Sequence, residues 1–100
     1  MKIFVFELGG ANVLLWDFDE DIEKKLGFYA FRYAVAESIE GAEEIVFKAL
    51  KKQMNELFRN TEKNPPRVTI EKTWELDSYK ELEEKLGGAT NNFIFFPDED

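Results

Sequence analysis

The sequence predicts an α+β fold, a two-layer sandwich in which a mixed or antiparallel sheet of about five strands carries two helices on one face. Two observations favour this class. Short apolar runs with the alternation typical of half-buried strands occur towards both ends of the chain. Between them, one long segment repeats apolar residues every three or four positions, as an amphipathic helix does. We expect residues 1–100 to form a single α+β domain, because 100 residues are enough to close one core.

The N-terminal third predicts three strands. Ile3 to Leu8 and Val13 to Phe18 are rich in β-branched and aromatic residues. Gly9 to Asn12 lies between them and favours the tight turn of a β-hairpin. Asp19 to Gly27 is expected to be a charged connection, and it leads into a third strand over Phe28 to Ala36.

The third predicted strand has two unlike faces, because side chains alternate along a strand. Its odd positions are bulky, namely Tyr29, Phe31, Tyr33 and Val35. Its even positions are mostly small, namely Phe28, Ala30, Arg32, Ala34 and Ala36. If the helices cover the alanines, the aromatic row faces outward; if they cover the aromatic row, that row is ordinary core. The sequence leaves both alternatives open.

A long helix is predicted to begin at Ile39, because Ser38 can accept a hydrogen bond from an amide of the first turn. Its apolar stripe consists of Ala42, Ile45, Val46, Ala49, Leu50, Gln53, Met54 and Leu57. Phe47, Met54 and Phe58 lie on a flank of that stripe and widen the apolar arc. Something besides one sheet face must therefore cover this flank.

The C-terminal part predicts a strand, a short helix and a last strand. Arg67 to Leu76 alternates, with an apolar row made of Val68, Ile70, Trp74 and Leu76. Ser78 and Glu81 match the reciprocal capping box of a helix start, and Gly87-Gly88 favours its end. Phe93 to Phe96 is the last apolar run. The predicted order is βββαβαβ, and a variant of the ferredoxin-like arrangement is the nearest common template.

The composition disfavours most chemistry. The chain has no His and no Cys and only two Ser, so few side chains are suited to covalent or acid-base catalysis, and no catalytic residue is predicted. A non-enzymatic protein is therefore favoured. The net charge of −8 repels phosphate backbones and anionic lipids, so neither nucleic acid nor membrane is an expected partner. The absence of Cys fits a reducing compartment, and a cytoplasmic location is expected.

An acidic run is the nearest approach to a metal site. Asp17, Asp19, Asp21 and Glu23 alternate like the first ligands of a calcium-binding loop. The positions that should then hold Gly and a bidentate Glu are occupied by Ile22 and Phe28. No metal and no cofactor is therefore predicted.

The segment Gly27 to Tyr33, Gly-Phe-Tyr-Ala-Phe-Arg-Tyr, is followed by Ala36-Glu37-Ser38 and Ala42-Glu43-Glu44. Together with Trp74 to Ser78 and the ending Phe95-Phe96-Pro97-Asp98, it resembles a small bacterial α+β domain family with a GFYxxR-like strand. That family has no assigned activity, so the resemblance implies a fold and no catalytic residue.

These observations favour an interaction module that self-associates or binds a protein partner. The candidate binding residues are Tyr29, Phe31, Arg32 and Tyr33, because exposed aromatic rows are typical of interfaces. Arg32 has room among alanines for a bidentate pair, either with a Glu of its own chain or with a carboxylate or phosphate of a ligand. The alternative hypothesis is a small ligand-binding domain or enzyme that uses Arg32, the tyrosines and a carboxylate.

Overall fold

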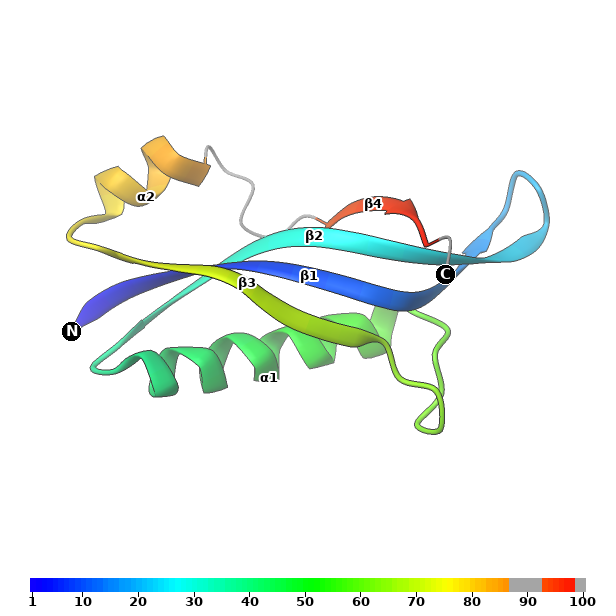
Figure 1. Ribbon diagram of the computed structural model, residues 1–100, viewed down its shortest axis with the longest axis horizontal. Coiled ribbons are helices and arrows are strands. Elements are labelled where there is room, and N and C mark those ends of the chain that lie inside the picture. Colours follow the sequence, from blue (N-terminus) through cyan, green and yellow to red (C-terminus); the bar gives the residue numbers. More distant parts are fainter. Residues whose placement is uncertain (87–92, 99–100) are drawn as a thin grey trace.

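The computed structural model describes residues 1–86 and 93–98. These residues form an antiparallel sheet with strand order β3-β1-β2-β4 and two helices (Figure 1). The elements are β1 (Lys2–Asp17), β2 (Ile22–Ala36), α1 (Ile39–Leu57), β3 (Arg67–Leu76), α2 (Tyr79–Leu86) and β4 (Phe93–Pro97). The α+β class is confirmed. The described sheet has four strands in the order ββαβαβ, so the prediction of about five strands in the order βββαβαβ is wrong.

The difference arises in the first hairpin. Ile3 to Leu8 and Val13 to Phe18 were predicted as two strands joined by a turn, but β1 runs through Gly9 to Asn12 without reversing. The chain turns instead at residues 18–21, and Ile22 to Gly27 of the predicted charged connection belong to β2. Glycine permits a turn without requiring one, and Gly10 stays extended with the ring of Phe28 lying where its Cβ would be.

The observed turn is fixed by the side chain of Asp17. Its Oδ1 accepts hydrogen bonds from the backbone N–H groups of Asp19 at 2.9 Å and Glu20 at 3.2 Å, the pattern of an Asx turn. Asp21 takes the left-handed conformation with φ 55°. The Lys24 ammonium lies 2.8 Å from the other carboxylate oxygen of Asp17. This turn is therefore closed by local hydrogen bonds, whereas the side-chain hydrogen bonds of the glycine segment run to distant residues.

A β-bulge interrupts the pairing of β1 with β2. Gly10 pairs with Phe28, whereas Val13 pairs with Leu26, so β1 holds one extra residue. Asn12 lies in this bulge with φ 58°, a conformation that Asn tolerates better than most residues. The extra residue changes which face the later side chains occupy. The buried residues of β1 on the α1 side are accordingly Phe4, Phe6, Leu8 and Val13.

Hydrogen bonds hold the bulge from both sides. The Asn60 amide accepts from the N–H of Leu14 at 2.9 Å and donates to the carbonyl of Asn12 at 2.7 Å. The side chain of Asn12 donates to Asn64 Oδ1 at 2.8 Å. The backbone N–H of Asn12 donates to the Asp98 carboxylate at 2.8 Å. The backbone groups that the bulge removes from the strand pairing therefore have partners in the loop after α1 and beyond β4.

α1 begins as predicted, since the Ser38 hydroxyl accepts from the N–H of Gly41 at 3.2 Å. Its buried residues are Ala42, Val46 and Leu50, which pack on Ala34 and Ala36 of β2. Ile45 and Leu57 of the predicted stripe are exposed, so the buried arc lies further towards Phe47 than predicted. Small side chains on both elements let the helix approach the sheet closely.

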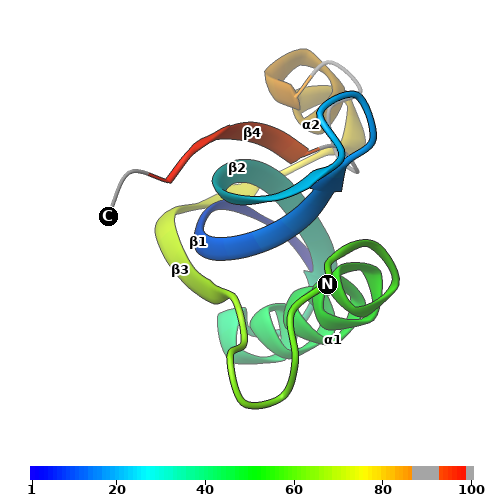
Figure 2. The same cartoon turned by 90° about the vertical axis from the view of Figure 1, so that its right-hand side faces the viewer.

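α2 lies on the opposite face of the sheet from α1, so the prediction of two helices on one face is wrong (Figures 1 and 2). A second bulge explains this. Glu7 pairs with Lys72 and Leu8 with Ile70, so Glu71 is an extra residue in β3. Beyond it, Trp74 and Leu76 point to the face away from α1, where Leu82 of α2 packs with them.

α2 begins directly after the predicted cap Ser78, and the last predicted strand is present. Ser78 Oγ accepts from the N–H of Glu81 at 3.3 Å, and the Glu81 carboxylate accepts from the N–H of Asp77 at 3.0 Å. The predicted glycines Gly87-Gly88 lie outside the described residues. Phe93 to Phe96 forms part of β4, which pairs with β2 at one edge of the sheet.

We expect Asn60→Ala to lower the free energy of unfolding by about 1–3 kcal/mol, because it leaves the N–H of Leu14 and the carbonyl of Asn12 without their partner. Urea denaturation measures the change. Asn55→Ala is the matched control, since Asn55 is exposed on α1. Equal stability of the two variants would contradict a structural role for the bulge contacts.

The pKa of Asp17 lies below its ordinary value of 3.8, chiefly because the Lys24 ammonium donates to its carboxylate and also because the N–H of Glu20 does. A lowered folded-state pKa means that the carboxylate stabilises the fold above its unfolded pKa. That contribution is lost as the pH falls through the folded value. We expect Lys24→Gln to raise the pKa of Asp17, measured by NMR titration. Lys63→Gln removes the same charge elsewhere and should leave this pKa nearly unchanged.

Candidate functional site

The sheet face opposite α1, here called the outer face, is covered over only part of its area. Leu82 of α2 packs on Ile3 and Val5 near one end of the sheet. Towards β4 the described residues place no helix over this face (Figure 1). Four large apolar side chains remain exposed there, with exposed fractions of 48% for Tyr29, 40% for Tyr33, 60% for Ile94 and 36% for Phe96. These four residues are called the aromatic patch.

The aromatic patch spans two paired strands. Tyr29 of β2 pairs with Ile94 of β4, and paired residues share a face. The ring centroids of Tyr29 and Phe96 are 5.0 Å apart. Phe31 continues the row between the two tyrosines, but it is half-buried and its ring lies 6.4 Å from that of Trp74. Phe31 therefore connects the exposed tyrosines with the buried cluster under α2.

The structure separates the four predicted binding residues. Tyr29, Phe31 and Tyr33 lie on the outer face, as expected if α1 covers the alanines. Arg32 lies on the α1 face and is only 7% exposed. Its guanidinium donates to Gln53 Oε1 at 2.9 Å and to the carbonyl of Phe31 at 2.8 Å. The tyrosines and Arg32 therefore do not converge on one pocket, and the geometry gives no support to a binding site that combines them.

Arg32 instead joins three elements. Its guanidinium carbon lies 4.9 Å from the centre of the Phe93 ring of β4, within the range of a cation–π contact, while Gln53 holds it to α1. Burial lowers the pKa of Arg32, because the charged form loses hydration. A guanidinium remains charged even so. Its contacts link β2, α1 and β4.

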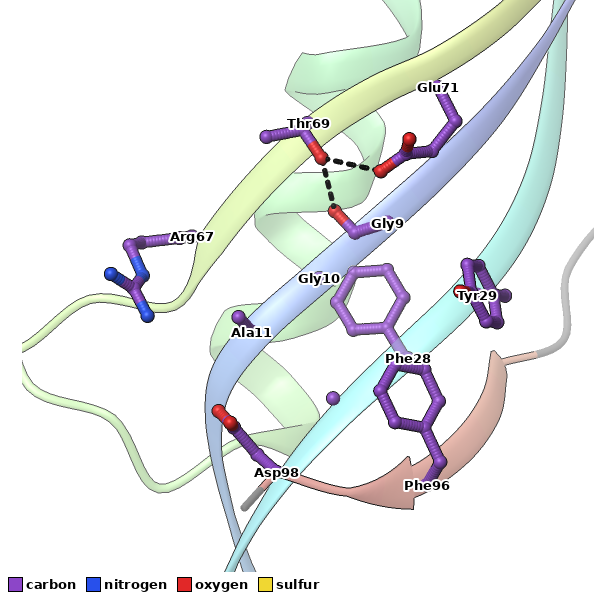
Figure 3. Close-up of a pocket in the computed structure, with 11 residues that line it drawn as sticks. Gly9, Gly10, Ala11, Phe28, Tyr29, Arg67, Thr69, Glu71, Phe96 and Asp98 are labelled. Atoms are coloured by element: carbon purple, nitrogen blue, oxygen red, sulfur yellow. Dashed lines mark hydrogen bonds between the residues drawn. The ribbon is translucent and has the colours of Figure 1, made fainter. Parts of the chain in front are cut away.

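A groove of about 460 Å³ lies next to the aromatic patch on the outer face (Figure 3). Its floor is the backbone of β1 and β2 at Gly9, Gly10, Ala11 and Gly27. Tyr29 and Phe96 form one wall, and Thr69 and Glu71 of β3 form the other. Phe28, Arg67 and Asp98 complete the lining. We call this feature the glycine groove.

Two glycines are required for the side chains of the walls to lie this close to the floor of the groove. A Cβ on Gly9 would lie 2.6 Å from Glu71 Oε1, and a Cβ on Gly27 would collide with the Phe96 ring. Thr69 Oγ1 donates to Glu71 Oε1 at 3.0 Å and lies 3.4 Å from the carbonyl oxygen of Gly9. The carboxylate of Glu71 is thus held over Gly9, beside Thr69 (Figure 3).

Sequence reasoning missed this groove, because Gly9 and Gly10 were assigned to a turn and Glu71 to a regular strand. One signal was available: Gly27 directly precedes a predicted strand, and Gly9 directly follows another. Glycine within a strand often marks a place where another group approaches the backbone closely. The partners of these glycines, Phe96 and Glu71, are distant in sequence, so only the strand register identifies them.

A second groove, of about 730 Å³, lies between α1 and the loop that follows it. Phe47 and Met54 of α1 line it together with Pro65 and Pro66 of the loop. Phe58 is buried, with its ring near those of Phe28, Phe93 and Phe95. Of the flank that was expected to need a cover, Phe58 is covered by β2 and β4. Phe47 and Met54, the other two residues of the flank, line this groove.

The acidic run at the first turn is engaged in local contacts. Asp17 is hydrogen-bonded to the turn and paired with Lys24, which also lies 3.0 Å from Glu20. Within residues 1–86 and 93–98, no group of three or more His, Cys, Asp or Glu side chains is placed to hold a metal ion. Over the same residues, neither helix has the length and apolar character needed to cross a membrane.

No protein-family model, curated protein or solved structure matches the chain. The resemblance to a family with a GFYxxR-like strand therefore stays a hypothesis. The function has to be inferred from the site itself.

A double-mutant cycle tests the role of Arg32. Because a hydrogen bond to a charged group contributes about 1.5–3 kcal/mol, we expect Arg32→Met and Gln53→Leu to be coupled by at least about 1 kcal/mol in the free energy of unfolding. The control pair is Lys2 and Glu75, which are 3.1 Å apart and exposed. Its coupling should stay below about 1 kcal/mol. Similar coupling in both cycles would contradict the structural role of Arg32.

Proposed function

We propose that this protein is an interaction module that binds a basic partner protein through the aromatic patch on its outer face. The observation that carries the proposal is the joint exposure of Tyr29, Tyr33, Ile94 and Phe96 on the part of the sheet that α2 leaves uncovered. Contiguous apolar surface of this kind is typical of interaction sites. Tyrosine suits such surfaces, since its ring is apolar and its hydroxyl can remain hydrated.

The arrangement of the layers supports the choice of face. α1 covers the small side of β2, and its contacts with Ala34 and Ala36 leave no room there for a partner. The outer face holds the larger side chains, yet α2 is short and packs near Ile3 and Val5. A partner seated beside α2 would bury the aromatic patch and complete the layer that α2 begins.

The charge of the chain supports a basic partner over a second copy. With 21 acidic and 13 basic residues, two copies repel each other, whereas a cationic protein is attracted. Electrostatic attraction of this kind speeds encounter and excludes partners of the wrong sign. Beside the aromatic row the outer face also carries Glu7 and Glu71, with Lys72 paired to Glu7.

To test this proposal, a photo-cross-linking amino acid would replace Tyr33 in the host cell, and in a second variant it would replace the exposed Tyr79 of α2. We expect an adduct with a basic protein at position 33 and none at position 79. The affinity of the purified pair should fall with added salt. An adduct with a second copy, or equal adducts at both positions, would contradict the proposal.

With the captured partner, Tyr29→Ala combined with Tyr33→Ala should weaken binding at least about tenfold, since central aromatic side chains dominate interface energies. Tyr79→Ala is the matched control and should change the affinity by less than about threefold. Phe31 is left intact, because its contact with Trp74 would make its loss a change of stability. Calorimetric titration measures the affinities, and unchanged binding of the double variant would refute the role of the patch.

A further inference from the structure

The glycine groove borders the aromatic patch and differs from it in chemistry. We propose that this groove receives an arginine side chain of the partner, an inference that rests on the proposed function. Its volume of about 460 Å³ falls within the range of roughly 300–1,000 Å³ typical of ligand clefts. Gly9 and Gly27 let Glu71 and the Phe96 ring lie close to the sheet backbone, so these two side chains border the groove.

The aromatic wall suits a flat cation. The rings of Tyr29 and Phe96 lie 5.0 Å apart and line the groove together. A guanidinium is planar and weakly hydrated, so it stacks on aromatic rings and is attracted to their faces. The chain itself already contains this contact, since the guanidinium of Arg32 lies over the Phe93 ring on the other face.

The opposite wall supplies the negative charge. Glu71 is held over Gly9, and Thr69 donates one hydrogen bond to its Oε1. An ionised carboxylate has roughly four acceptor positions, so Glu71 can also accept from a guanidinium. Arginine can stack on one wall with the plane of its guanidinium and donate to the other wall from the edge.

The charged residues that line the groove favour a cation. Asp98 also lines it, and the Asp98 side chain is 8% exposed, with its carboxylate bound to the N–H of Asn12 and 3.9 Å from the Lys25 ammonium. Arg67 is the basic residue of the lining, and its side chain is directed away from the glycines (Figure 3). The carboxylate that faces the floor is that of Glu71, so an anionic ligand would be repelled there.

The test uses the isolated protein and blocked amino acids, so it needs no partner. N-acetyl-arginine amide would be titrated into labelled protein and followed by amide NMR shifts. We expect saturable shifts at Gly9, Gly27 and Tyr29. N-acetyl-lysine amide should bind at least about fivefold more weakly, because an ammonium cannot stack and donate from its edge in the same way.

Two variants on β3 locate the contact. Glu71→Gln should weaken arginine binding at least about fivefold, since it removes the charge but keeps the shape of the side chain. Glu75→Gln is the control, because Glu75 is paired with Lys2 beyond the second bulge and does not line the groove. No saturable shift, an equal response to lysine, or full binding by Glu71→Gln would each overturn the proposal.

The result of the arginine titration is independent of the result of the cross-linking experiment. If the arginine probe fails while substitutions of Tyr29 and Tyr33 weaken partner binding, the groove assignment is wrong and the interaction module stands. If the probe binds at the groove as described but no adduct forms at position 33, the groove recognises arginine while the aromatic patch has no role in partner binding.

Discussion

The bulge at Asn12 determines which side chains of β1 reach the core. β1 has 16 residues, and without an extra residue its regular alternation would place Val13 on the same face as Ile3 and Val5. The bulge returns Val13 to the face that carries Phe4, Phe6 and Leu8. One long strand can thus serve the same core at both of its ends. Because Val13 faces α1, it packs with Phe28 of β2 and with Phe58 at the end of α1.

The second bulge, at Glu71, has the opposite effect on β3. It turns Trp74 and Leu76 away from α1, so α2 packs against the outer face. The same extra residue places the Glu71 carboxylate over Gly9. A single irregularity in an edge strand therefore accounts for the position of α2, for the uncovered area beside it and for the charged wall of the glycine groove. Bulges often redirect side chains near functional sites in this way.

Sequence reasoning located the elements better than their connections. The Ser38 cap, the start of α1 and the strand at Phe28 to Ala36 follow from local signals, and each is found in the structure. The hairpin was misplaced because the hydrogen bonds of Asp17 to its own turn outweigh the flexibility of Gly9 and Gly10. The faces of β3 could not be predicted, since Val68, Ile70, Trp74 and Leu76 all lie at even positions and only the strand register reveals the bulge between them. For the site, the sequence identified the aromatic row, but the groove depends on neighbours from distant strands.

The hydrogen bond from Asn12 to Asp98 joins residues 86 positions apart. During synthesis, β1 is made before its partners β2 and β3 and before the Asp98 carboxylate. The newly made β1 carries Ile3 to Leu8, with four consecutive apolar residues that the finished fold buries almost completely. Exposed segments of this kind associate readily with other chains. A strand that the folded protein buries on both faces is therefore exposed to other chains until β2 and β3 have been made.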